Sequence, residues 1–131
     1  MKQNDQDHKV NMDAASTLQR MSAKRKSREK KLTSALDALT EQLSLMGAKK
    51  IILFGSLADS RVGSWSDLDL LVVMPDSKSG KEWFREIYEK TDPEVPADIF
   101  PFTEEELEHK IPQSSFIRHA LKTGKVVYEK G

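Results

Sequence analysis

Apolar residues are unevenly distributed along this 131-residue chain. Residues 1–31 hold few large apolar side chains, whereas residues 32–131 carry every Phe, Trp, Tyr and Ile. Residues 1–11 are polar and unpatterned, so a disordered tail is expected there. The contrast predicts a polar, basic tail or helix extension over residues 1–31 and a single domain over residues 32–131. About a hundred residues suffice for one small sheet covered by helices.

Helical periodicity is clearest at residues 32–46, where large apolar residues recur every three or four positions and Gly47 follows as a helix-ending residue. The pattern leaves open whether this helix extends back through the basic run at residues 24–31. Further helices are expected over residues 81–90, 104–111 and 114–123, the second of them introduced by a capping box from Thr103 to Glu106. The expected inner face of the helix at 81–90 consists of Trp83, Phe84, Ile87 and Tyr88.

Short apolar runs between these helices predict a sheet. Strands are expected at residues 51–54, 68–73 and 97–100, with Pro101 ending the third, and a final edge strand at 126–128. Gly55 and Ser56 break the chain after the first strand, a short helix is expected at 57–61, and a turn at 63–66. The order of elements predicts an α/β (α+β) fold, a small mixed β-sheet with flanking helices.

Charge separates along the chain although the formal net charge is zero. Residues 1–50 hold 11 Lys and Arg against 6 Asp and Glu, and residues 51–131 hold 10 against 15, so the halves carry +5 and −5. Cysteine is absent, which excludes disulfides and thiolate metal sites. No apolar run approaches the ~20 residues of a membrane span, and the first ten residues lack the apolar stretch of a signal peptide. A cytoplasmic protein is therefore expected.

Candidate chemistry lies between the first two expected strands. Gly55 lets the chain turn sharply and a phosphate approach the main chain. Ser56 offers a hydroxyl and an N–H where a helix N-terminus favours an anion. Asp67 and Asp69 are two residues apart, so their side chains point to one face. Two carboxylates on one face can share divalent cations. Asp98 joins them if its strand pairs beside theirs, and it would then bind a metal ion or accept a proton.

The sequence around these residues, GSLA at 55–58 and GSWSDLDL at 63–70, resembles the nucleotidyltransferases of the DNA polymerase β-like superfamily. The small size is similar to the minimal nucleotidyltransferase (MNT) branch, and the resemblance covers about residues 33–129. It implies the nucleotidyltransferase fold and transfer of a nucleoside monophosphate from an NTP, expected to be ATP. Two Mg²⁺ ions and release of pyrophosphate are also implied.

The resemblance also assigns roles and a partner. Gly55 and Ser56 match the family's phosphate-binding pair, Asp67 and Asp69 its metal ligands, and Asp98 its third catalytic and metal-binding acid. Minimal members often act as the antitoxin beside a HEPN-domain protein, and some modify a tyrosine of that partner with AMP. A HEPN-type partner is therefore expected here. Contact with nucleic acid is not expected, because the basic run lacks interleaved aromatics.

Two alternatives stay open. Minimal members commonly carry Arg-Gly where this chain has Asp59 and Ser60, which favours a non-catalytic antitoxin that masks its partner by contact. The other alternative is a small-molecule nucleotidyltransferase of the aminoglycoside type, although those members generally carry an additional helical domain for the acceptor. The sequence leaves the acceptor, the base preference and the oligomeric state open.

Overall fold

A computed structural model of the chain describes residues 5–55 and 67–131, with the side chains of residue 23 and of residue 26 onward. It separates into two compact units, Met1–Lys31 and Leu32–Gly131. The elements are, in chain order, α1 (Asp5–Leu45), β1 (Lys50–Phe54), β2 (Leu68–Val73), α2 (Gly80–Lys90), β3 (Ala97–Phe102), α3 (Glu104–Lys110), the 3₁₀ turn η1 (Ile111–Gln113), α4 (Ser115–Thr123) and β4 (Lys125–Glu129).

Helix α1 begins at Asp5, so the prediction of a disordered tail over residues 1–11 was wrong for residues 5–11, and the helix does extend through the basic run. No Gly or Pro interrupts residues 5–45, and α-helical hydrogen bonds are local. The helix ends as expected at Gly47, whose φ of 106° is left-handed. The N–H groups of Gly47 and Ala48 donate to the carbonyls of Ser44 and Leu43, which is the Schellman arrangement.

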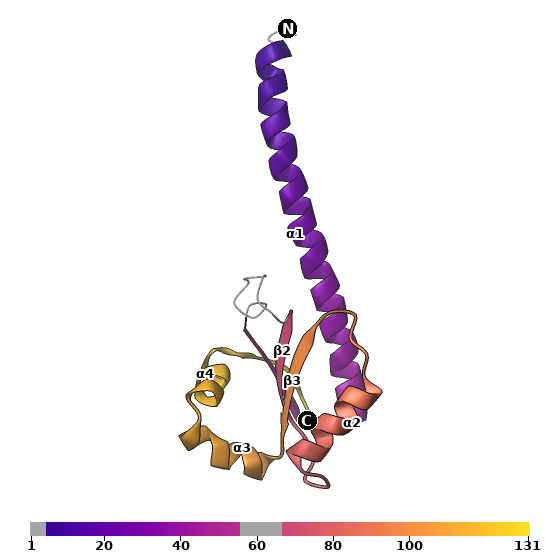
Figure 1. Cartoon of the computed structure of the whole chain (residues 1–131), viewed down its shortest axis with the longest axis vertical. Coiled ribbons are helices and arrows are strands. Elements are labelled where there is room, and N and C mark those ends of the chain that lie inside the picture. The colour runs from indigo at the N-terminus through magenta and orange to yellow at the C-terminus, as the bar shows by residue number, and fades with distance from the viewer. Residues whose placement is uncertain (1–4, 56–66) are drawn as a thin grey trace. The chain divides into compact units, whose positions relative to one another are not determined.

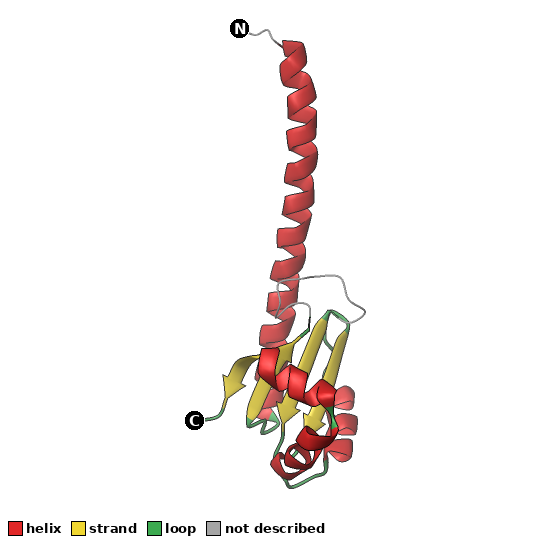
Figure 2. Cartoon of the chain, turned by 90° about the vertical axis from the view of Figure 1, so that its left-hand side faces the viewer, coloured by secondary structure: helices red, strands yellow, loops and turns green. Residues whose placement is uncertain are grey.

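The four strands form one mixed sheet in the order β3-β2-β1-β4 (Figure 2). Strand β1 is antiparallel to both β2 and β4, whereas β2 and β3 are parallel and joined through α2. A parallel pair needs such a crossover, because the chain must return to the same edge of the sheet. The predicted fold class, a small mixed sheet with flanking helices, is thereby confirmed, and β4 is the expected edge strand.

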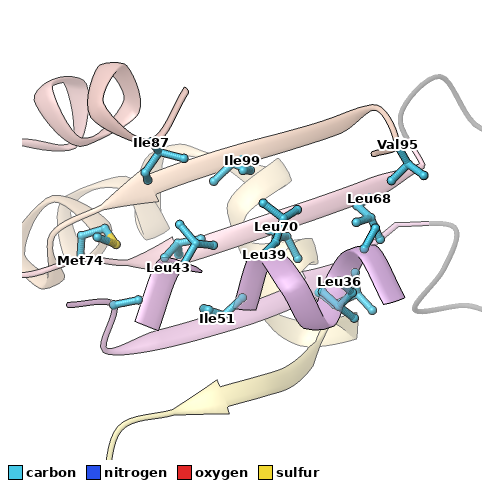
Figure 3. Packing of buried hydrophobic residues seen from close by; sticks show 14 of the residues in the cluster. Leu36, Leu39, Leu43, Ile51, Leu68, Leu70, Met74, Ile87, Val95 and Ile99 are labelled. Atoms are coloured by element: carbon cyan, nitrogen blue, oxygen red, sulfur yellow. The ribbon is translucent and has the colours of Figure 1, made fainter. Parts of the chain in front are cut away.

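Helices cover both faces of this sheet. Figure 1 shows α3 and α4 on one side of the strands and α2 on the other. On the α2 side, Leu36, Leu39 and Leu43 of α1 pack over Ile51 and Leu70 (Figure 3). The other face holds a second cluster, in which the strands contact α4 and the partly buried residues of α3 and η1. Strand β2 is buried on both faces, which explains its uninterrupted apolar run after Asp69.

The structure confirms one of three local expectations and corrects the other two. Trp83 and Ile87 form the inner face of α2, but Phe84 and Tyr88 are exposed, because they lie one position further round the helix from the two buried residues. The capping box from Thr103 to Glu106 is present at α3. Pro101 does not end β3, because β3 is an edge strand and needs no N–H there.

No helix within the described part of the chain combines the length and the apolarity needed to cross a bilayer.

Replacing Leu43 by Ala tests the packing of α1 on the sheet. Leu43 is fully buried, so L43A is expected to lower the free energy of unfolding by about 2–5 kcal/mol. Leu45, two residues further along the same helix, is 81% exposed. L45A is therefore expected to change the free energy of unfolding by less than about 0.5 kcal/mol. Urea denaturation of both variants measures the difference. Equal costs would contradict the packing described for α1.

Candidate active site

Gly55 directly follows β1 and lies against Asp69, near the start of β2. Its φ of 83° lies in the left-handed region that favours glycine. A Cβ atom added to Gly55 would lie 2.3 Å from Oδ2 of Asp69, far inside van der Waals contact. The Asp69 carboxylate therefore rests directly against the Gly55 backbone, and no residue with a side chain fits there without displacing it.

Asp69 and Asp98 lie beside each other on neighbouring strands. They are partners in the parallel register of β2 and β3, so their side chains share one face of the sheet. Asp98 is exposed and Asp69 is partly buried. Asp98 was expected to join the candidate site if the third strand paired next to the second. Strands β2 and β3 do pair in this way. Two carboxylates on adjacent strands create a region of negative charge that favours a cation.

Asp67 precedes β2 and is held through its backbone. Its N–H donates to the carbonyl of Pro96 at 3.0 Å, and the N–H of Leu68 donates to the same oxygen at 3.2 Å. These bonds join the start of β2 to the residue immediately before β3. Asp67 is partly buried and stands two residues before Asp69. The three predicted acids therefore occupy the same end of the paired strands.

Tyr88 is exposed on α2, but its hydroxyl contacts β3 on both sides of Asp98. Its hydroxyl donates to the carbonyl of Ala97 at 3.3 Å and accepts from the N–H of Ile99 at 3.1 Å. It thereby satisfies two groups on the open edge of β3 and fixes the backbone that carries Asp98. Helical periodicity indicates that Tyr88 lies near the buried side of α2. Only the packing of α2 against β3 reveals that its hydroxyl bonds the backbone around Asp98.

The metal prediction can be compared with the donor groups. Carboxylate oxygens suit a hard cation such as Mg²⁺, so the donor chemistry fits. Within residues 5–55 and 67–131, however, no three or more Asp, Glu or His side chains are grouped so as to hold a metal ion. The structure brings Asp69 and Asp98 into register without closing a three-carboxylate site. The assignment of Asp67, Asp69 and Asp98 to two Mg²⁺ ions thus stays a prediction.

Part of the candidate site lies outside the described residues. Ser56, the expected phosphate-binding partner of Gly55, belongs to residues 56–66, as do the expected short helix at 57–61 and the Asp59-Ser60 departure. Their predicted roles remain predictions. Among the described residues, the candidate site consists of Gly55, Asp67, Asp69 and Asp98.

Substitution of Gly55 by Ala tests the contact with Asp69. G55A is expected to lower the free energy of unfolding by at least about 2 kcal/mol, because left-handed backbone strain adds to the collision with the carboxylate. In a D69A background the collision is gone, so the same substitution is expected to cost at least about 1 kcal/mol less. Urea denaturation of the single and double variants measures this coupling.

Gly47 provides the control for that cycle. It also has a positive φ, but an added Cβ would meet Pro75 and not Asp69. The cost of G47A should therefore be the same with and without D69A. Purely additive costs for G55A and D69A would contradict the described contact.

Comparison with known proteins adds to this geometry. Searches of curated proteins and of solved structures gave no significant match. A family model described as a nucleotidyltransferase domain matches residues 32–124, which include β1, β2, β3 and all four residues of the candidate site. The match covers more than two thirds of the chain, and the chain belongs to the nucleotidyltransferase domain family.

Proposed function

We propose that this chain transfers a nucleoside monophosphate from an NTP, ATP in the first instance, to a hydroxyl group of an acceptor. Membership of the nucleotidyltransferase domain family supports nucleotidyl transfer in general. The observation that carries the finer proposal is the register of Asp69 with Asp98, together with the Gly55 backbone that lies against Asp69. A backbone without a side chain beside two carboxylates suits a phosphate chain that arrives with cations.

In the proposed reaction, the acceptor hydroxyl oxygen forms a bond to the α-phosphorus of the NTP. The bond between that phosphorus and the oxygen bridging to the β-phosphorus breaks, and pyrophosphate leaves with the electron pair. Asp98, the most exposed of the three acids, takes the proton of the hydroxyl. Gly55, with Ser56, holds the β- and γ-phosphates at the main chain.

Asp67, Asp69 and Asp98 would hold Mg²⁺ in this proposal. When bound, Mg²⁺ supplies neutralisation of the phosphate charges and of the charge that develops on pyrophosphate. The residues of the chain orient the carboxylates for this role: the Pro96 carbonyl fixes the backbone at Asp67, and Tyr88 fixes the backbone around Asp98. Without such cations, the adjacent carboxylates would repel the triphosphate.

The acceptor belongs to the proposal as well. We propose a hydroxyl on a HEPN-type partner protein, with this chain as the antitoxin of the pair. The support is the resemblance to minimal nucleotidyltransferases together with the size of the matched domain, which is confined to residues 32–124.

Asn substitutions of the paired acids test the proposal. The chain is incubated with Mg²⁺ and an extract of the cells that express it, using ATP labelled at the α-phosphate or at the γ-phosphate. In the product that forms only when the chain is added, label from the α-position alone is expected, since nucleotidyl transfer retains the α-phosphate. D69N and D98N are each expected to lower the transfer rate at least about 100-fold, with the thermal unfolding midpoint changed little.

Asp76 provides the matched control. It is an exposed aspartate just beyond the opposite end of β2, and D76N is expected to transfer label at the wild-type rate. Wild-type transfer by D69N or D98N would remove these residues from the mechanism. Label from the γ-position in a product that forms only when the chain is added would identify phosphoryl transfer instead and contradict the proposed reaction.

A further inference from the structure

Three phenylalanine rings form a cluster on the face of the sheet that α3 and α4 cover. Phe54 of β1 and Phe100 of β3 have ring centroids 6.0 Å apart. Phe116, in the first turn of α4, lies 5.5 Å from each of them in edge-to-face geometry. Such pairs stabilise a defined arrangement of the rings. Two strands and a helix therefore hold Phe116 in place.

This aromatic cluster adjoins the paired acids. Phe54 is the register partner of Asp69 across β1 and β2, and directly opposed side chains lie on the same face. Phe100 stands two residues after Asp98 on β3, so these two also share a face. The side chains of Phe54 and Phe100 thus lie on the same face of the sheet as the carboxylates of Asp69 and Asp98.

Phe116 is the accessible member of the cluster. Its side chain is 49% exposed, whereas Phe54 is 8% exposed and Phe100 is partly buried. The Phe116 ring centroid lies 5.5 Å from that of Phe54, the register partner of Asp69, so Phe54 connects the exposed ring to the row of side chains that holds the carboxylate. A fixed, half-exposed ring that contacts the neighbour of Asp69 is placed to meet a planar group joined through a sugar to phosphates bound at the carboxylates.

We propose that Phe116 is the stacking surface for the nucleobase of the NTP. The inference rests on the proposed function, because the phosphates at Gly55 and the acids define one end of the nucleotide. Every nucleobase has a π-face, and stacking on an aromatic side chain tolerates different bases. The Phe116 ring carries no hydrogen-bonding group, so this contact adds affinity for purines and pyrimidines alike without selecting one base by its edge.

Replacing Phe116 by Leu separates base stacking from phosphate binding. Binding of ATP and of inorganic tripolyphosphate, each with Mg²⁺, is measured by calorimetry on the full chain. F116L is expected to bind ATP roughly 5- to 100-fold more weakly and tripolyphosphate as tightly as the wild type does. F116Y keeps the ring and is expected to bind ATP with wild-type affinity.

Phe84 supplies the matched control. It is also 49% exposed but lies on α2, on the other face of the sheet, so F84L is expected to leave both affinities unchanged. Wild-type ATP affinity in F116L would overturn the inference while leaving the proposed function standing. Equal weakening of ATP and tripolyphosphate would also overturn it, since the ring would then act through packing alone. If the wild type binds neither ligand, the proposed function itself fails, and this inference falls with it.

Discussion

The contact between Gly55 and the Asp69 carboxylate is the constraint on which the candidate site depends. Strand β1 ends at this glycine, and β2 returns beside β1 with Asp69 opposite Phe54. The left-handed backbone at Gly55 and the absence of a Cβ let the carboxylate lie against the main chain. Any larger residue would displace the Asp69 carboxylate from the Gly55 backbone. Gly55 thus determines both the direction of the chain after β1 and the position of the Asp69 carboxylate.

Strand β2 gives this arrangement its rigidity. It lies between β1 and β3, and its residues from Leu70 to Val73 are buried by helices on both faces. The acids stand where that apolar run begins, so a well-packed strand supports polar groups at its open end. A buried strand has little freedom to shift, because an interior at close-packed density resists movement. Strand β3 pairs in parallel with this strand, and the pairing places Asp98 opposite Asp69.

The two faces of the sheet hold hydrophobic clusters of different size. The face covered by α1 and α2 holds the larger hydrophobic cluster, with Leu39, Leu43 and Ile87 fully buried. The opposite face holds a smaller cluster, and Phe116 of α4 is half exposed there. Tyr88 of α2 reaches the open edge of β3, where its hydroxyl bonds the backbone on both sides of Asp98.

The sequence by itself determined the features that depend on local physics. Helical periodicity and Gly47 located the end of α1, the Thr103 capping box located α3, and the resemblance carried by residues 55–58 and 63–70 indicated the nucleotidyltransferase family that the family model confirms. The roles of Gly55, Asp67 and Asp69 stay predictions. Hydrogen bonds and side-chain direction within one segment follow from neighbouring residues, so a pattern can reveal them. Tertiary structure decided which strands pair. It placed β3 parallel to β2 with Asp98 beside Asp69, carried the edge strand through Pro101, and turned Tyr88 toward β3. Those outcomes arise from contacts between segments far apart in the chain, and no local pattern encodes the register in which two such segments meet.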